Sequence, residues 1–464
     1  MPHPAPSPTP DLTGRDTIVA IASGQAAAGV GIIRLSGPLS HDIAARVCGV
    51  AVLKPRYASH RAFRSDTGEV LDDGIALYFP GPRSFTGEDV VELQAHGSPA
   101  VLASLVALCV RYGARRARPG EFSERAFLEG RIDLLQAEAI ADLIAATDER
   151  AARAARRSLQ GDFSKRVDEV STLLLNTRIH VEAAIDFVDE SLETLGLSAI
   201  ESNLNKVDLA VSSLLEAAQR GRRLNEGLHA VLLGAPNAGK SSLLNALAGY
   251  DRAIVTDVAG TTRDLLHEVV RVDGVSLELV DTAGLRDSSD AIEMEGIRRA
   301  RAQASQADLA LIVVDPRDDA ASVVMDDARN AVRRLWIYNK SDLVGEVANL
   351  LHEGEPQFAE DPYVQLSAKT GENMESLHEA IRNIVSDGAM SESTSEFSAR
   401  ARHTEALQRT QEWVAQARMH LTHEDLELTA EALRIAHDTL GELTGRISPD
   451  ELLGHIFSSF CIGK

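Results

Sequence analysis

Eight residues near the middle of the chain, Gly234-Ala-Pro-Asn-Ala-Gly-Lys240-Ser241, constrain the fold more than any other segment. They match the pattern GxxxxGK[ST], follow an apolar run that ends at Leu233, and open a stretch with helical periodicity. Glycines let a backbone curl around phosphate groups, and the N–H groups at a helix N-terminus supply positive potential. The segment therefore predicts a strand, a phosphate-binding loop and a helix, in which Lys240 reaches the β- and γ-phosphates and Ser241 is a ligand of Mg²⁺.

Four further motifs follow in the order that a guanine-nucleotide site requires: Thr261-Thr262, Asp281-Thr-Ala-Gly284, Asn339-Lys-Ser-Asp342 and Ser367-Ala-Lys369. We expect Asp281 to hold Mg²⁺ through water and Thr262 to complete the coordination shell of the metal. The Asp342 carboxylate can accept hydrogen bonds from N1–H and N2–H of guanine, and adenine offers no such pair of donors. Gly284 can sense the γ-phosphate, and Ser367-Ala-Lys369 can close over the base. An accidental set of this kind is rare, so we interpret these motifs as the site of a GTPase.

Two residues depart from the common Ras-like pattern. Leu285 stands where many Ras-like GTPases carry a glutamine that orients water, so another group must orient water here. Asn237 lies within the phosphate loop, and its carboxamide oxygen could bind a monovalent cation placed against the phosphates. Such an ion would offset developing negative charge, as an arginine finger does. A local hydrogen bond within the loop is the alternative interpretation of Asn237.

Composition narrows the class of protein. A length of 464 residues suggests two to four domains. No apolar run is long enough to span a membrane, and the Pro-rich start lacks the apolar stretch of a signal peptide. Three cysteines without CxxC spacing favour a reduced, cytoplasmic setting over a disulfide framework or a zinc site.

The charge of the chain limits the ways in which it can bind nucleic acid. The net charge of -22 argues against a protein that coats nucleic acid. Arginine-rich segments at 111–118, 150–157 and 220–223 are candidates for local phosphate contacts, although a solvated helix face is the simpler interpretation of each.

Hydrophobic patterning divides the chain into segments. β-Rich runs at 17–22, 30–35, 75–79 and 90–93, with an apolar helix at 99–110, predict a mixed α/β domain over residues 16–130. Helical periodicity dominates residues 131–225 and returns over 387–464. Between them, β-rich runs at 229–233, 277–280, 309–314, 335–338 and 363–366 alternate with helices over 226–386, which predicts a largely parallel sheet wrapped by helices. We expect a disordered tail over 1–15, and a multidomain α/β protein whose α-helical domain is interrupted by an inserted P-loop domain.

Segments outside the nucleotide motifs also carry recognisable sequence. The C-terminus reads Phe457-Ser-Ser-Phe-Cys461-Ile-Gly-Lys464, and the other segments are 29–37, 84–92, 118–127, 136–142 and 183–187. Together with the nucleotide motifs they resemble the MnmE/TrmE family of tRNA-modification GTPases, whose chains end in Cys-x-Gly-Lys. The resemblance runs from about Asp16 to Lys464.

The resemblance implies an N-terminal folate-binding and dimerisation domain, an α-helical domain in two parts, and an inserted Ras-like GTPase domain. It implies a homodimer whose GTPase domains meet on activation, and a K⁺ ion bound by Asn237, Thr256, Val258 and Thr261. Glu293 matches a residue that helps position the attacking water, although by itself it would be read as an ordinary residue at a helix start.

The residues expected to contact the nucleotide and its ions are Asn237, Ala238, Gly239, Lys240, Ser241, Ser242, Thr256, Asp257, Val258, Ala259, Gly260, Thr261, Thr262, Asp281, Thr282, Ala283, Gly284, Asn339, Lys340, Asp342, Ser367, Ala368 and Lys369. Those expected to take part in catalysis are Glu293, Asn237, Lys240 and Cys461. Expected metal ligands are Ser241 and Thr262 for Mg²⁺, and the four residues named above for K⁺.

The resemblance also implies a second reaction centre. The family works with the flavoprotein MnmG (GidA), which carries FAD, in a heterotetramer-type complex that modifies carbon five of the wobble uridine in certain tRNAs. Formyl- or methylene-tetrahydrofolate donates the one-carbon unit, and its contacts would fall on Arg34, Glu92, Arg131 and Lys464. The family commonly has Lys at the Arg131 position, and Arg keeps the charge but not the shape. Cys461 would lie near the folate and the tRNA base, although a cysteine near a chain end is most often inert.

Two other classes of protein share some of these motifs. A ribosome-assembly GTPase that acts as an RNA-binding switch can carry the same phosphate loop, but it typically adds a basic RNA-binding domain. A regulatory GTPase without an RNA role leaves the N-terminal segments unexplained. The acidic flanks and the Cys-Ile-Gly-Lys ending favour the tRNA-modifying enzyme.

Overall fold

The computed structural model describes residues 16–24, 26–146, 149–186, 197–226, 228–235, 237–250, 267–272, 275–281, 307–317, 329, 333–344, 358–387, 397–446, 450–458, 460 and 463. The chain forms two compact units. One comprises Met1–Glu216 together with Arg402–Lys464, and the other comprises Ala217–Ala401. The second unit interrupts the first in sequence, as expected for an inserted domain. The domain boundaries given above stay predictions.

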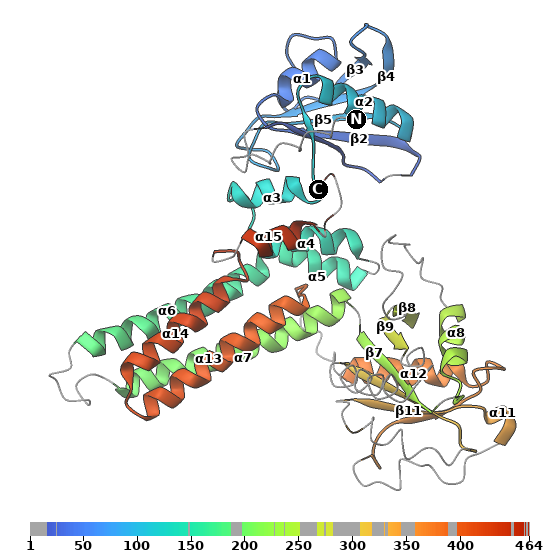
Figure 1. Ribbon diagram of the computed structural model, residues 1–464, viewed down its shortest axis with the longest axis vertical. Coiled ribbons are helices and arrows are strands. Elements are labelled where there is room, and N and C mark those ends of the chain that lie inside the picture. The colour runs from blue at the N-terminus through green and yellow to red at the C-terminus, as the bar shows by residue number, and fades with distance from the viewer. Residues whose placement is uncertain are drawn as a thin grey trace, which may run out of the picture. The chain divides into compact units, whose positions relative to one another are not determined.

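The first unit begins with a six-stranded sheet in the order β3-β4-β5-β2-β1-β6. Its strands are β1 (Ile18–Ile21), β2 (Ala28–Ser36), β3 (Ser59–Arg64), β4 (Val70–Phe79), β5 (Val90–Gly97) and β6 (Arg115–Arg116). All neighbours are antiparallel except β1 and β6, which are parallel. Helices α1 (Ser40–Val47) and α2 (Pro99–Arg111) pack against the sheet and share its core (Figure 1). The predicted mixed α/β domain is confirmed.

Strand β3 and helices α1 and α3 (Glu121–Leu128) were not predicted from sequence. In β3 only Ser59 and Phe63 are buried, so the strand carries too few apolar residues to show a pattern. Helix α3 starts after Gly120, which has a φ of 66°, and buries charged as well as apolar side chains. Strand β3 and helix α3 depend on tertiary contacts that hydrophobic periodicity does not reveal.

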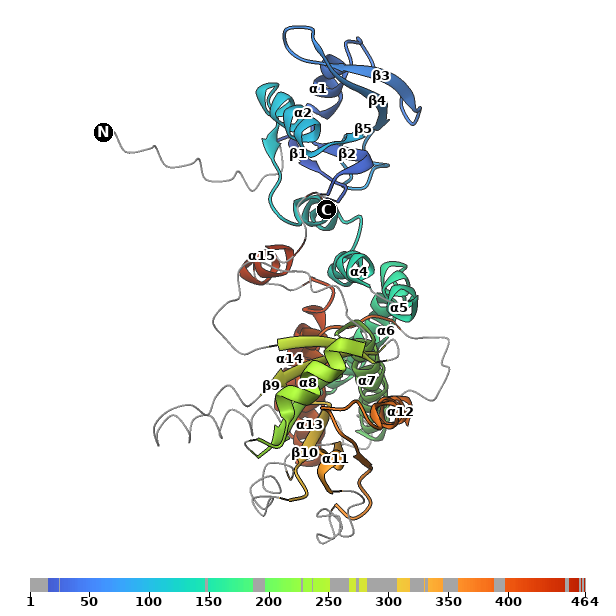
Figure 2. The ribbon, with the colours of Figure 1, turned by 90° about the vertical axis from the view of Figure 1, so that its right-hand side faces the viewer.

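The helical part of the first unit comes from both ends of the sequence. Its helices are α4 (Leu134–Ala145), α5 (Glu149–Leu159), α6 (Asp162–Asp186), α7 (Leu197–Glu226), α13 (Ala401–Thr422), α14 (Leu426–Gly441) and α15 (Asp450–Ser458). Helix α14 lies along α6, and α13 lies along α7 (Figures 1 and 2). Gln411 donates to Ser212 Oγ at 2.8 Å across the latter pair. The predicted helical domain in two parts is confirmed.

A buried ion pair joins the two parts of this helical domain. Glu138 of α4 is 1% exposed and accepts hydrogen bonds from Nε of Arg402 at 2.7 Å and from Nε2 of His403 at 2.7 Å. Burial alone would raise the pKa of this carboxyl, but His403 and Arg402 outweigh that effect and hold its pKa far below the usual range. Phe163 of α6 packs edge-on against the His403 ring. The charged cluster therefore fixes the start of α13, where the chain returns from the inserted unit.

The inserted unit holds a second six-stranded sheet, in the order β12-β11-β10-β7-β9-β8. Its strands are β7 (Leu228–Gly234), β8 (His267–Val272), β9 (Val275–Asp281), β10 (Leu309–Val314), β11 (Arg334–Tyr338) and β12 (Tyr363–Gln365), and its described helices are α8 (Lys240–Tyr250), α11 (Ser341–Val344) and α12 (Met374–Asp387). All neighbouring strands are parallel except β8 and β9. The prediction of a largely parallel sheet is confirmed.

Both faces of this second sheet are buried. Leu232 of β7 packs with Leu243 of α8 and Leu377 of α12 on one face. Val231, the preceding residue, packs with Trp336 on the opposite face. Burial on both faces explains why these strands appear in the sequence as continuous apolar runs instead of alternating ones.

The points where the chain enters and leaves the inserted unit touch each other. A Cβ atom at Gly221, near the end of α7, would lie 2.1 Å from the carbonyl oxygen of Phe397. Only glycine permits this approach of two backbones. Because the two ends of the inserted segment are adjacent, the insertion interrupts the sequence of the helical domain without forcing its two parts to separate. Among the helices that the structure describes, none has both the length and the apolar character needed to cross a bilayer.

We predict that Glu138→Ala destabilises the unit containing the helical domain by about 3–5 kcal/mol, because it leaves the buried His403 and the partly buried Arg402 without their carboxylate. Calorimetric unfolding of the full chain at neutral pH measures this as a lower midpoint for one transition.

The cluster around Glu138 also predicts sensitivity to acid. The pKa of Glu138 is depressed in the folded state, so its contribution to stability is present above the ordinary glutamate pKa and is lost as pH falls toward the folded-state pKa.

Glu431→Ala is the matched control, since Glu431 forms an exposed pair with Arg434 and such pairs contribute little to stability. Equal midpoint shifts for the two variants would contradict the role assigned to Glu138.

Candidate nucleotide-binding site

The predicted nucleotide motifs gather at one edge of the parallel sheet. Each described motif follows the carboxyl end of a parallel strand: the phosphate loop follows β7, Asn339 follows β11, and Ser367 lies just beyond β12. Loops at this edge of a parallel sheet form the usual ligand crevice in such folds. The edge therefore brings together residues that are far apart in the sequence.

The phosphate loop curls back on itself before α8. Lys240, at the first position of α8, is 6% exposed, and its Nζ donates to the carbonyl oxygens of Gly234 at 2.8 Å and Ala235 at 3.0 Å. Asn237 has a φ of 65° and Gly239 a φ of 101°, both left-handed values. This is the turn geometry that points successive N–H groups at an anion. Lys240 is thus held beside the loop that it is expected to serve.

Asn339 joins the phosphate loop to the loops on the base side. It is 3% exposed, and its Nδ2 donates to the carbonyl oxygen of Ala238 at 2.9 Å. Its Oδ1 accepts from the backbone N–H of Lys340 at 2.8 Å and of Ala368 at 3.0 Å. A Cβ atom at position 239 would lie 2.1 Å from Nδ2 of Asn339, so this contact requires glycine there. One carboxamide therefore fixes the positions of three loops.

Lys340 makes a second connection to the phosphate loop. Its Nζ donates to the carbonyl oxygen of Asn237 at 2.6 Å and to Oδ2 of Asp315 at 2.8 Å. The hydrogen bonds from Arg317 to Asp315, and the one from Lys340, hold the pKa of the Asp315 carboxyl well below its usual range. Sequence reasoning missed Asp315. Its position directly after β10, at the ligand edge of the sheet, was the available signal.

The residues expected to read the base also lie together. Ser367 is fully buried, and its Oγ donates to Oδ1 of Asp342 at 2.7 Å. This bond orients one carboxylate oxygen, and among the described residues no group donates a hydrogen bond to Oδ2 of Asp342. The backbone N–H of Ser341 donates to the carbonyl of Leu366, which ties the two base-side loops together. Lys369 follows Ala368 in the turn that closes this edge.

The described residues fit a Mg²⁺ ion. Ser241 is exposed in the first turn of α8, one residue after Lys240. The last residue of β9, Asp281, is paired in register with Leu232 of β7, two residues before the loop begins at Gly234. A hydroxyl and a carboxylate are hard oxygen donors of the kind that Mg²⁺ binds. Ser242 is also exposed in this turn.

Several predicted site residues lie outside the described residues. They are Thr256, Asp257, Val258, Ala259, Gly260, Thr261, Thr262, Thr282, Ala283, Gly284, Glu293, Cys461 and Lys464. Their assigned roles stay predictions.

A second group of predicted residues meets on the N-terminal sheet. Arg34 of β2 and Glu92 of β5 stand opposite each other in the register, and Nε and Nη2 of Arg34 donate to Oε1 of Glu92 at 3.0 and 2.8 Å. The guanidinium lies 5.5 Å from the ring centroid of Phe85 and 5.8 Å from that of Phe122. The two rings, which sequence reasoning did not single out, hold the charged pair in place.

Two further segments lie on the same N-terminal domain. Arg131 approaches the loop after β4, since a Cβ atom at Gly87 would be 3.4 Å from its Cγ. Gly463, within the C-terminal signature, has a φ of 99°, and a Cβ atom there would lie 2.1 Å from the carbonyl oxygen of Ile21. Because Ala20 of β1 pairs with Arg34, this contact brings the chain's end to the strand beside Arg34. A glycine is required at position 463 for that approach.

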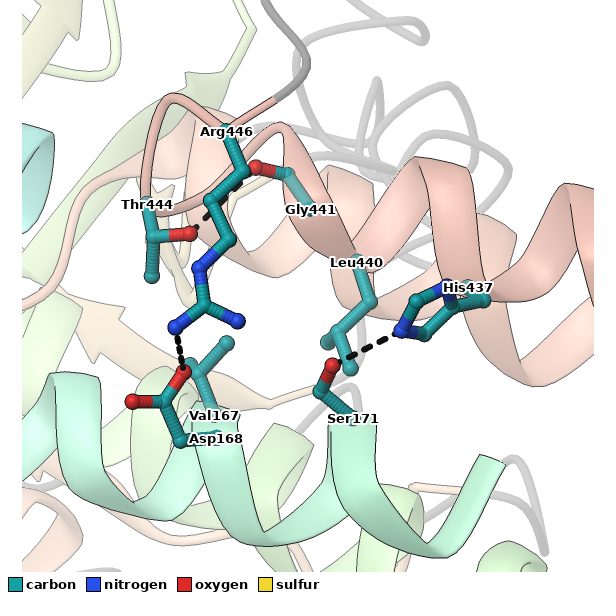
Figure 3. Close-up of a pocket in the computed structure, with 8 residues that line it drawn as sticks. All are labelled: Val167, Asp168, Ser171, His437, Leu440, Gly441, Thr444 and Arg446. Atoms are coloured by element: carbon teal, nitrogen blue, oxygen red, sulfur yellow. Dashed lines mark hydrogen bonds and ion pairs between the residues drawn. The ribbon is translucent and has the colours of Figure 1, made fainter. Parts of the chain in front are cut away.

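A small cavity in the helical domain is not a substrate site. It lies between α6 and α14, has a volume of about 50 Å³, and is lined by Asp168, Ser171, His437 and Arg446 among others (Figure 3). Ser171 and His437 share a hydrogen bond of 2.9 Å, and Arg446 pairs with Asp168 at 3.0 Å (Figure 3). A space of this size admits water but no nucleotide or folate.

Comparison with known proteins finds relatives along nearly the whole chain. A family model described as the MnmE helical domain matches residues 134–461, and one described as the GTP-binding protein TrmE N-terminus matches residues 17–131. The chain is 58% identical over 450 residues to the tRNA modification GTPase MnmE of Xanthomonas campestris pv. campestris (strain B100), covering 97% of this chain and 99% of that protein. It is 53% identical to the tRNA modification GTPase MnmE of Xylella fastidiosa (strain 9a5c), with 97% and 98% covered.

Among solved structures, the G domain of the T. maritima FeoB iron transporter is 25% identical, with a TM-score of 0.26, and matches 34% of this chain and 98% of that one.

We predict that Asn339→Ala weakens binding of guanine nucleotides by about tenfold or more, because three backbone groups of three loops lose a buried partner and each unsatisfied group costs about 1–3 kcal/mol. Titration with a fluorescent guanine nucleotide measures the change. Asn245→Ala, on the exposed side of α8, is the control. If both variants bind like the unmodified protein, Asn339 does not organise the site.

Proposed function

The chain belongs to the MnmE family of tRNA modification GTPases, and from that premise we propose that it is a potassium-activated GTPase that modifies transfer RNA together with a flavoprotein partner. The observation that carries the proposal is the coincidence of this family match with a loop assembly in which Asn339 ties the phosphate loop to the base-reading loops. The helical and N-terminal family models together span most of the chain, so the proposal concerns the whole protein.

In the proposed nucleotide site, Lys240 exchanges its two carbonyl partners for the β- and γ-phosphates of GTP. Asp342 receives the two N–H groups of guanine and is oriented for this by Ser367. Ser241, Thr262 and Asp281 would hold Mg²⁺, and Asn237, Thr256, Val258 and Thr261 would hold K⁺. When bound, these cations offset the negative charge that develops during phosphoryl transfer.

Hydrolysis needs a residue that orients water, and we propose Glu293 for this role. Leu285 has no polar atom on its side chain, so it cannot act where many Ras-like GTPases use glutamine. A carboxylate can accept a hydrogen bond from the attacking water and fix its direction. We propose that the GTPase domains of two copies associate when GTP and K⁺ are bound, and that Glu293 becomes effective in that state.

The proposed second site lies on the N-terminal domain. Arg34, Glu92 and Arg131 offer charged groups that suit the polar pterin ring and the glutamate carboxylates of a folate. The close packing of Gly463 on β1 supports a place for Cys461 and Lys464 in the same neighbourhood. We propose that this site binds formyl- or methylene-tetrahydrofolate as the one-carbon donor for carbon five of the wobble uridine.

The proposed assembly is a homodimer formed through the N-terminal domains, working in the cytoplasm with the FAD-carrying MnmG (GidA) protein and tRNA. The proposed domains are residues 16–130 for folate binding and dimerisation, 131–225 and 387–464 for the helical domain, and 226–386 for the GTPase. The alternative of a regulatory GTPase without an RNA role left the N-terminal segments unexplained, and the family models account for them. The alternative of a ribosome-assembly GTPase would need a basic RNA-binding domain, whereas the flanks of the nucleotide domain are acidic.

Deleting the gene should remove the carboxymethylaminomethyl-type modification at carbon five of wobble uridines, measured by mass spectrometry of nucleosides from bulk tRNA. Complementation with the unmodified gene should restore it, whereas Asp281→Ala and Cys461→Ser should not, since each removes one of the two proposed centres. Unchanged modification together with unassembled ribosomal subunits would instead support the ribosome-assembly hypothesis.

Glu293→Ala should lower the GTP turnover number by about a hundredfold or more, the scale of a lost water-positioning group, while GTP affinity stays within about twofold. Steady-state hydrolysis in KCl and nucleotide titration measure the two quantities. Replacing KCl by NaCl with the unmodified protein should also depress turnover, because the proposed cation site would lose its ion. Retained hydrolysis by Glu293→Ala would remove this residue from the mechanism.

A further inference from the structure

Helix α5 has two chemically distinct faces. Its sequence, Glu149-Arg-Ala-Ala-Arg-Ala-Ala-Arg-Arg-Ser-Leu159, contains four arginines and one glutamate. Ala151, Ala154, Ala155 and Ser158 are buried, and they face the neighbouring helices α4 and α6. At 3.6 residues per turn, the four arginines fall within about 120° of the helix circumference, on the side opposite the alanines.

The arginines on this face are available to a ligand. Arg150, Arg153 and Arg156 are exposed, and Arg157 is half-buried. Within the described part of the chain, Arg150, Arg156 and Arg157 make no hydrogen bond or ion pair, whereas most other arginines of this acidic protein have a carboxylate partner. Arg153 pairs with Glu149 at 2.8 Å, but both side chains are largely exposed and such a pair exchanges readily.

From this geometry we propose that the face of α5 formed by Arg150, Arg153, Arg156 and Arg157, hereafter the arginine face, binds the phosphate backbone of tRNA. The inference rests on the proposed function, which supplies the polyanion, and adds the surface that receives it. Guanidinium groups match phosphate oxygens in pairs, so four of them on one rigid helix form a compact phosphate-binding surface. The stripe from Arg150 to Arg157 is about 10 Å long at 1.5 Å per residue, enough to follow two or three successive phosphates.

The composition of the arginine face argues against other partners. Protein interfaces rely on aromatic or large aliphatic anchors, and membrane-bound amphipathic helices need such side chains as well. The outward side of α5 presents arginine and alanine, and it lacks an exposed large apolar residue. A surface of arginines without apolar side chains is suited to a polyanion.

The acidic remainder of the chain restricts the approach of RNA to the arginine face. With a net charge of -22, most of the surface repels RNA, so a local group of unpaired arginines determines where RNA can approach. Backbone contacts of this kind position an RNA without reading its sequence, and recognition of the wobble base is left to other groups.

The test uses the full-length protein and total tRNA purified from cells that lack this gene. The variant is Arg150→Gln/Arg156→Gln/Arg157→Gln, which removes three charges and keeps good helix formers on the exposed side of α5. The control is Arg409→Gln/Arg418→Gln/Arg434→Gln, which removes the same number of exposed charges from helices α13 and α14. Circular dichroism and GTP turnover verify that both variants are folded.

Affinity for tRNA is measured as a function of KCl concentration. We expect the α5 variant to bind about tenfold or more weakly, and the slope of log K against log salt to fall in magnitude by about 2–3, one unit for each lost phosphate contact. The control should keep the affinity within about twofold and keep the slope. A uniform loss in both variants would mean that total charge, not the arginine face, governs binding, and would overturn the proposal.

Equal tRNA binding by the α5 variant and the unmodified protein would also overturn the proposal, including the case in which the variant loses its flavoprotein partner instead. A failure of the proposed function would be seen in a different measurement, the wobble-uridine modification in the deletion strain. That measurement does not depend on which surface of the protein binds tRNA, so the two failures can be told apart.

Discussion

The side chain of Asn339 is the interaction on which the nucleotide site depends. It donates to the phosphate loop and accepts from two base-side loops, all within a nearly dry environment. Lys340 repeats the connection through Asn237 and is itself oriented by Asp315. Because these loops follow different strands, their contacts depend on the parallel pairing of those strands. Binding of GTP to both the phosphate loop and the base-side loops therefore depends on the correct packing of the inserted unit.

Contacts within each unit hold the chain on either side of the point where it returns from the insertion. Gly221 and Phe397 touch where the chain leaves and returns, and the Glu138–Arg402–His403 cluster fixes the first residues after the return. A buried charged cluster of this kind resists gradual displacement, since breaking it leaves an uncompensated charge.

Sequence predicted the fold wherever one physical signal dominated. Continuous apolar runs predicted the parallel strands, because both sheet faces are buried, and the glycines of the phosphate loop predicted its turn. Polar β3 and charged α3 escaped prediction, since their stability comes from contacts distant in the chain. The roles of Asp315 and of Phe85 escaped prediction because each side chain acts by holding another functional residue, through a contact that is distant in the chain. Arginine spacing in α5 was visible in sequence, but its lack of partners was not.

If these loops bind guanine, Asp342→Asn should change which purine base the protein binds. An asparagine amide can donate to the C2 carbonyl of xanthine, where the aspartate accepts from the amino group of guanine. We expect the purified variant to bind and hydrolyse xanthosine triphosphate, while its affinity for GTP falls by about tenfold or more, the scale of lost charge-assisted hydrogen bonds. Unchanged GTP affinity with no gain of xanthosine triphosphate binding would contradict the account, because the base would then be read elsewhere.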